Sequence, residues 1–217
     1  MSIISFIKKA VSIFPLEAQR NIYLYKNKIA RSGILKSWGN QGSPVPPPHQ
    51  YKQFIVEQVG KKYGLKTLVE TGTCLGHMIE AQRNNFFKLY SIEVEPTLYK
   101  NANKYFSPYL HIEIIEGDSA IKLGQILKRI SNESVLFWLD GHYSGGITGM
   151  GDKECPIYEE LQAIFDQRVK TKYILIDDAR CFDGTNDYPT LDELNQFVKS
   201  KDKDLKMEIL HDIIHLH

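Results

Sequence analysis

Residues 67–76 read TLVETGTCLG, an apolar run that passes through Glu70 into a turn with glycines at positions 72 and 76. The run predicts a short buried strand, and the apolar pattern over 78–84 predicts that a helix follows the turn. The same order recurs along the chain. Further strands are expected at 87–94, 111–115, 135–139 and 173–176, and further helices at 96–105, 119–130, 156–167 and 190–199. Such alternation favours an α/β fold, a doubly wound, mostly parallel Rossmann-like sheet with helices on both faces. Ligands of such sheets bind at the carboxyl ends of the strands.

The segment before this region differs in composition. Residues 1–32 are expected to be helical, and the Pro-rich stretch 39–49 is expected to be an extended linker. We therefore divide the chain into an N-terminal helical extension with its linker, 1–48, and a nucleotide-binding domain, 49–217. The apolar start is expected to pack on the domain or on a partner, for example as a homodimer through the N-terminal helices. A signal peptide and a membrane-surface helix are the alternatives.

Composition narrows the class of protein. The 217 residues include 27 Lys and Arg against 26 Asp and Glu. This near-neutral charge does not indicate that the protein binds nucleic acid. The three cysteines form no metal-binding or disulfide pattern, which favours a reducing, cytoplasmic location. No apolar run is long enough to be a transmembrane segment.

The first two strands are each followed by a possible ligand-binding feature, a glycine loop after the first strand and an acid at the end of the second. The loop 70–76 can turn tightly and let a ligand approach its backbone, although a plain strand-to-helix turn would look the same. Glu93 ends the second strand about twenty residues later, a spacing that suits an acid accepting both hydroxyls of a ribose. The alternative role for Glu93 is that of a solvated acid at the start of a helix. For Glu95, which precedes Pro96, we prefer this second role.

The third strand is followed by Asp118 and Ser119. Either residue can cap the next helix, and either can face an adenine amino group. The residues alone leave both roles open.

Three carboxylates follow the fourth and fifth strands, Asp140, Asp177 and Asp178. Neighbouring strand ends would bring them into one cleft, where unpaired carboxylates repel one another. Oxygen ligands of this kind suit Mg²⁺ or Ca²⁺. The alternative is that one of the last two residues caps a loop and only the other points inward.

In this order, the residues resemble the class I S-adenosylmethionine-dependent methyltransferases. Within them, the metal-dependent O-methyltransferases are most similar, such as catechol O-methyltransferase and the macrolide-sugar enzymes. The resemblance covers about residues 65–182. It implies S-adenosylmethionine and a bound Mg²⁺ as cofactors, with Asp140, Asp177 and Asp178 as metal ligands. The cofactor-binding residues it implies are Glu70, Gly72, Thr73, Gly76, Glu93, Asp118, Ser119 and Asp140.

The sequence also departs from that family. The catechol enzyme has a lysine base shortly after the fourth-strand acid, but here no lysine follows before Lys153. We therefore expect His142, with Asp140, to be catalytic and to take the proton from a hydroxyl of a small-molecule or sugar acceptor. The alternative is that His142 only forms a hydrogen bond to the strand end or to the lid. Tyr143 is expected to form a pocket wall, and the Gly-rich stretch 144–151 a lid.

Two further regions bear on the site and the sheet. Arg180 is expected either to bind an anionic acceptor group or to form a structural ion pair. Residues 207–216 are expected to form one or two terminal strands. They look short for the family's terminal hairpin, so the sheet edge is expected to be trimmed or completed by a partner.

Three other functions fit parts of the pattern. A dehydrogenase should show G-x-G-x-x-G, which the 70–76 loop lacks. A metal-dependent hydrolase would use the three aspartates but leave Glu93 and the glycine loop unexplained. A non-catalytic binding or scaffold protein would keep the fold, and the acids at the strand ends argue against it.

Overall fold

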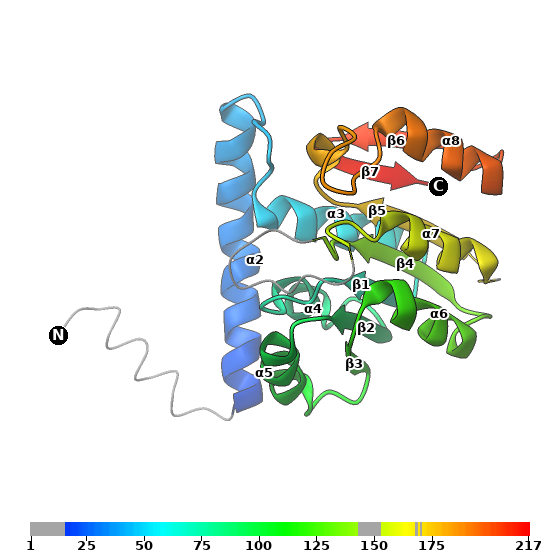
Figure 1. Cartoon of the computed structure of the whole chain (residues 1–217). Helices are drawn as coiled ribbons and strands as arrows, with labels where there is room; N and C mark the ends of the chain where they lie inside the picture. Colours follow the sequence, from blue (N-terminus) through cyan, green and yellow to red (C-terminus); the bar gives the residue numbers. More distant parts are fainter. Residues whose placement is uncertain (1–15, 143–152, 168, 170) are drawn as a thin grey trace. The chain divides into compact units, whose positions relative to one another are not determined.

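The computed structural model describes residues 16–142, 153–167, 169 and 171–217 (Figure 1). The chain divides into two units, residues 1–51 and 52–217. None of the described helices is long and apolar enough to cross a membrane. The three cysteines are free thiols.

The first unit contains one long helix, α2 (Leu16–Asn40). The predicted helix end near residue 32 is wrong by two turns, because a single interior glycine, Gly33, costs a helix only about 1 kcal/mol. After the helix the chain turns back, and the indole of Trp38 donates a hydrogen bond to the carbonyl of Pro44 at 2.8 Å. The Trp38 ring also packs against Tyr51, with 4.6 Å between centroids.

The second unit is built on a seven-stranded sheet in the order β3-β2-β1-β4-β5-β7-β6 (Figure 1). The first five strands are parallel, and β7 pairs antiparallel with both β5 and β6. The chain moves outward from β1 to β3 and then returns to β4, so the strand order reverses between β1 and β4. The strands are β1 (Thr67–Thr71), β2 (Lys88–Glu93), β3 (Ile112–Glu116), β4 (Ser134–Leu139), β5 (Thr171–Ile176), β6 (Met207–Leu210) and β7 (Ile213–Leu216). This confirms the predicted doubly wound fold.

Alternate strand residues face opposite sides of the sheet, and both sides are covered. In β4, Val135, Phe137 and Leu139 belong to one core cluster, which also contains the buried side chains of α6 (Ser119–Arg129), α7 (Ile157–Asp166) and α8 (Leu191–Lys201). Leu136 and Trp138 point to the other side and are fully buried. That side is covered by α3 (His49–Lys62), α4 (His77–Gln82) and α5 (Pro96–Phe106).

The C-terminal residues form a complete hairpin, so the expectation of a trimmed sheet edge is wrong. Only His211 and Asp212 separate β6 from β7, and both have positive φ, 47° and 68°. This is the geometry of a two-residue type I′ turn, which matches the twist of the flanking strands. A turn this short leaves enough residues for both strands.

The buried face of α3 also differs from the prediction. From the sequence, the spacing of the apolar residues Tyr51, Phe54, Ile55 and Val59 predicts that these four form its apolar face. In the structure Val56, Val59 and Gly60 are buried, while Phe54 and Ile55 are only half-buried. A Cβ on Gly60 would lie 2.6 Å from the Phe86 ring, so a glycine allows the close approach of that ring. Lys52 lies one turn before Val56 and therefore shares the buried stripe.

Candidate active site

The carboxyl ends of β1, β2 and β4 border one cleft at the point where the strand order reverses. This is where open α/β sheets bind their ligands. The cleft is lined by Gly72, Cys74, Ile92, Glu93, Val94, Gly117, Ser119, Asp140, Gly141 and His142.

Gly72 lets the loop after β1 pass the end of β4. Its φ is +81°, and a Cβ at this position would lie 2.2 Å from the backbone carbonyl oxygen of Asp140. Backbone cannot yield to such a contact as a flexible side chain could. The position therefore requires glycine both for its left-handed conformation and for space.

Glu93 is the acid that faces this loop. Its side chain is buried, and its Oε2 accepts a hydrogen bond from the amide of Cys74 at 2.7 Å, while Oε1 accepts one from the amide of Glu95 at 2.9 Å. A carboxylate has about four lone-pair sites, so these two bonds leave capacity toward the cleft. Glu95 instead caps α5, accepting from the amide of Leu98 at 2.6 Å, as the sequence predicts.

Glu70 and Thr73 lie behind the loop and are not among the residues that line the cleft. The hydroxyl of Ser91 donates to Glu70 and lies 2.6 Å from the hydroxyl of Thr73. Burial raises the pKa of Glu70 well above its usual range. The structure thus gives both residues a bracing position beneath the loop. Gly76 is also outside the lining, and its φ of +73° and the nearby Phe106 ring fit glycine.

Asp118 and Ser119, which follow β3 after Gly117, have different roles in the structure. Asp118 caps α6, because its Oδ1 accepts a hydrogen bond from the amide of Ala120 at 2.8 Å. Ser119 is buried and lines the cleft.

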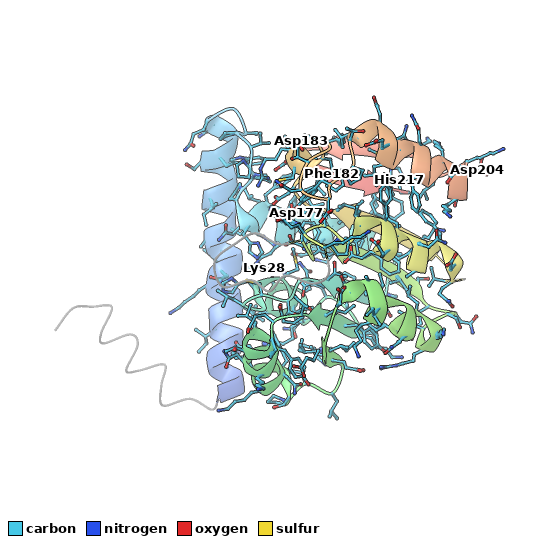
Figure 2. All side chains as sticks on the ribbon, viewed as in Figure 1. Lys28, Asp177, Phe182, Asp183, Asp204 and His217 are labelled. Carbon is cyan, nitrogen blue, oxygen red and sulfur yellow. The ribbon has the colours of Figure 1, made fainter. Side chains whose placement is uncertain are left out.

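A cluster of acids and cations lies beside the cleft at the ends of β4 and β5. Asp177, labelled in Figure 2, follows β5 and is 1% exposed. The ammonium of Lys52 lies 2.5 Å from its Oδ2 and 3.1 Å from Oδ1 of Asp178. The other oxygen of Asp177 accepts the amide of Asp178 at 2.9 Å. Lys52 was not identified in the sequence.

Asp178 has two further neighbours, the cation Arg180 and the ring of His142. Nη1 of Arg180 lies 2.7 Å from its Oδ1 and also contacts Asp212 in the β6–β7 turn. Nε2 of His142 lies 3.1 Å from its Oδ2, while Nδ1 of the same ring lies 3.6 Å from Oδ1 of Asp140. Arg180 thus forms structural ion pairs, one of the two roles expected for it from the sequence.

These neighbours set opposite electrostatic conditions for the two adjacent acids. Burial, together with the negative charge of Asp178, raises the pKa of Asp177. Burial also opposes ionisation of Asp178, but the hydrogen bond from His142 and the charge of Lys52 outweigh it and lower its pKa. Asp140 is disfavoured as an anion by burial and by Asp177, so its pKa is raised.

The three acids predicted to bind a metal do converge, but the oxygens of Asp177 and Asp178 are engaged. Both oxygens of Asp177 and both of Asp178 have protein partners. Over the described ranges, no group of three or more His, Cys, Asp or Glu side chains has the arrangement of a metal site. A divalent ion would have to displace Lys52, so the residues as arranged do not fit one.

A buried acid that no sequence pattern indicates, Glu160, lies next to Gly141 of the cleft. Glu160 comes from the first turns of α7, and a Cβ on Gly141 would lie 2.9 Å from its Oε1. Burial raises its pKa to about 7. No sequence motif marks an acid inside a helix as part of such a site.

Two expectations about the acceptor side concern residues that the structure does not describe, the pocket wall at Tyr143 and the lid over 144–151. Lys153, the first lysine after the fourth strand, is exposed and pairs with Glu159. Tyr188 packs against His142, with 5.8 Å between ring centroids.

Comparison with known proteins gives the fold. No family model matches the sequence, and no curated protein matches it. Among solved structures, the O-methyltransferase from Bacillus cereus in complex with S-adenosylhomocysteine is 12% identical, with a TM-score of 0.55, over 86% of this chain and 89% of that one. The methyltransferase PaMTH1 from Podospora anserina, also bound to S-adenosylhomocysteine, is 15% identical, with a TM-score of 0.53, over 94% and 96%.

A third structure is the O-methyltransferase TomG from Streptomyces achromogenes, which takes part in tomaymycin synthesis and was solved with S-adenosylmethionine. It is 14% identical, with a TM-score of 0.52, over 86% of this chain and 87% of that one. Together with the strand order and the position of the cleft, these likenesses show that the chain has the class I S-adenosylmethionine-dependent methyltransferase fold.

Proposed function

We propose that this protein is a methyltransferase that uses S-adenosylmethionine to methylate a hydroxyl oxygen of a small molecule or sugar. The observation that carries the proposal is Glu93. It is buried at the end of β2, lines the cleft, and is held by the backbone amides of Cys74 and Glu95. An acid fixed in this place suits a pair of ribose hydroxyls.

The remaining cleft residues fit the other parts of the cofactor. Gly72 and Gly117 line the cleft without side chains, and Ser119 and Asp140 add polar groups. Bound there, the cofactor would supply a methyl group made electrophilic by its sulfonium. The protein's part is to hold an acceptor oxygen in line with that methyl group, since alignment alone provides much of the rate of such reactions.

We assign the acceptor's proton to the pair formed by His142 and Asp140. Both residues line the cleft, and 3.6 Å separates Nδ1 of the ring from Oδ1 of the acid. Asp178 and Tyr188 hold the imidazole from two other directions. A ring fixed in this way stays within reach of a hydroxyl that enters the cleft.

The choice of an oxygen acceptor comes from the structural neighbours, since hydroxyl and amine groups both donate hydrogen bonds to carboxylates. Two of the three neighbours reported above are named as O-methyltransferases, and we extend that acceptor class to this chain.

The test is methyl transfer from S-adenosylmethionine, labelled in its methyl group, to a panel of sugars, vicinal diols, phenols and amines. We expect label on a hydroxyl acceptor, and we expect His142→Gln to lose turnover while it still binds S-adenosylhomocysteine. His111→Gln, a change outside the cleft, is the matched control. Label on amines alone would contradict the proposed acceptor.

A further inference from the structure

Lys52 reaches the acid cluster from a distant part of the sequence. It lies in the first turns of α3, on the stripe that also buries Val56 and Val59 against the sheet. Its side chain is only 14% exposed. A lysine is almost never buried to this degree without a partner, and here it has two, Asp177 and Asp178.

The position of the ammonium is the position that a bridging cation would need. Nζ lies 2.5 Å from Asp177 and 3.1 Å from Asp178, one oxygen from each carboxylate. A divalent ion shared by the two acids would sit at about 2.0–2.6 Å from such oxygens. The ammonium and a metal ion therefore exclude one another.

The other oxygens of these acids are occupied as well. Asp177 Oδ1 accepts the amide of Asp178, and Asp178 Oδ2 faces the ring of His142. Arg180 shares Asp178 Oδ1 with Lys52 and continues to Asp212. Lys52 and Arg180 thus supply to the cluster the positive charge that a bound Mg²⁺ was expected to supply, and His142 adds a hydrogen bond.

We propose that Lys52 is the built-in cation of this cluster: its ammonium, bridging Asp177 and Asp178, stands where a divalent metal ion would stand, and the site works without one. Lys52 is then a positioning residue. It fixes Asp178, which in turn fixes the ring of His142 at the cleft. The inference rests on the proposed function only for the role of His142, because the exclusion of a metal follows from the ion pairs alone.

The experiment is a titration of the whole chain with Mn²⁺ at pH 8, followed by the electron paramagnetic resonance of the free ion. Four proteins are compared: the wild type, Lys52→Met, Asp178→Asn and, as matched control, Lys62→Met. Lys62 lies on the same helix and is exposed. Methionine keeps the length of the lysine stem without its charge.

We expect weak Mn²⁺ binding by the wild type, Asp178→Asn and Lys62→Met, and binding at least about tenfold tighter by Lys52→Met, because that change leaves the buried Asp177 without the ammonium that pairs with it. Wild-type binding as tight as that of Lys52→Met, or no gain in Lys52→Met, would overturn the proposal. If Lys52→Met does not fold, the wild type and Asp178→Asn decide: equal weak binding supports the proposal, and tighter binding by the wild type overturns it.

A parallel titration of the same samples with S-adenosylhomocysteine keeps the two proposals apart. Lys52 does not line the cleft, so Lys52→Met should bind S-adenosylhomocysteine as the wild type does. Failure of every sample to bind it would count against the proposed function and leave the Mn²⁺ result to stand by itself.

Discussion

Replacing Gly72 by alanine tests whether the loop after β1 is as tightly fitted as the structure shows. Two costs add at this position. A left-handed φ of +81° costs an alanine about 1–2 kcal/mol, and a Cβ 2.2 Å from the carbonyl oxygen of Asp140 forces backbone to move, which costs about 1–3 kcal/mol more. The expected loss in the free energy of unfolding is about 2–5 kcal/mol. Gly64→Ala is the matched control, since Gly64 has a φ of +63° but no atom within 4 Å of an added Cβ.

Urea denaturation of the two variants and the wild type measures the difference. Gly64→Ala should lose only the conformational cost of about 1–2 kcal/mol. Equal losses in the two variants would refute the reasoning, because the contact with Asp140 would then contribute nothing. A change in the slope of the transition would show instead that the unfolded state had changed.

Two further predictions concern other parts of the second unit. Burial lowers the pKa of His215 to about 4. As the pH falls, this histidine therefore binds a proton in the unfolded chain before it does so in the folded protein. The free energy of unfolding should drop by roughly 2–4 kcal/mol between about pH 6.5 and pH 4. The variant His215→Gln keeps a polar partner for Tyr173 but cannot titrate. Its denaturation curves should therefore lack that part of the pH dependence. An unchanged pH dependence of stability would contradict the prediction. Thr190→Ala removes a capping box at the start of α8, formed with Glu193, and should lower stability by about 1 kcal/mol in the same assay, whereas no loss would show that the cap is not needed.

The order of elements could be predicted from the sequence because a buried parallel sheet leaves a strong pattern. Runs such as 135–139 are apolar throughout, since both sides of β4 are covered, and Gly72 and Gly76 mark the turn that follows β1. The same reasoning placed Glu93 and Asp140 at strand ends beside one cleft, where the structure has them.

The sequence left open whether residues 207–216 form one strand or two, because the turn between them carries no usual signal. His211 and Asp212 adopt positive φ, a conformation that sequence reasoning expects of Asn-Gly or Asp-Gly. Residues 207–210 are also more exposed than the core strands, so their hydrophobic pattern is weak.

The cations of the acid cluster could not be found from local sequence. Lys52 lies 125 residues before Asp177, and the predicted apolar face of α3 was rotated away from the face that the structure buries. The repulsion among Asp140, Asp177 and Asp178 correctly indicated that positive charge must be near. It did not indicate whether a metal ion or side chains from other elements supply that charge.

The central claim is the cofactor site, and calorimetric titration with S-adenosylhomocysteine in EDTA tests it most directly. The wild type and Glu95→Ala should bind one equivalent, because Glu95 caps α5 and does not line the cleft. Glu93→Ala should bind about a hundredfold more weakly, the loss expected for two hydrogen bonds to a charged acceptor. No binding by the folded wild type, or equal binding by Glu93→Ala, would contradict the account.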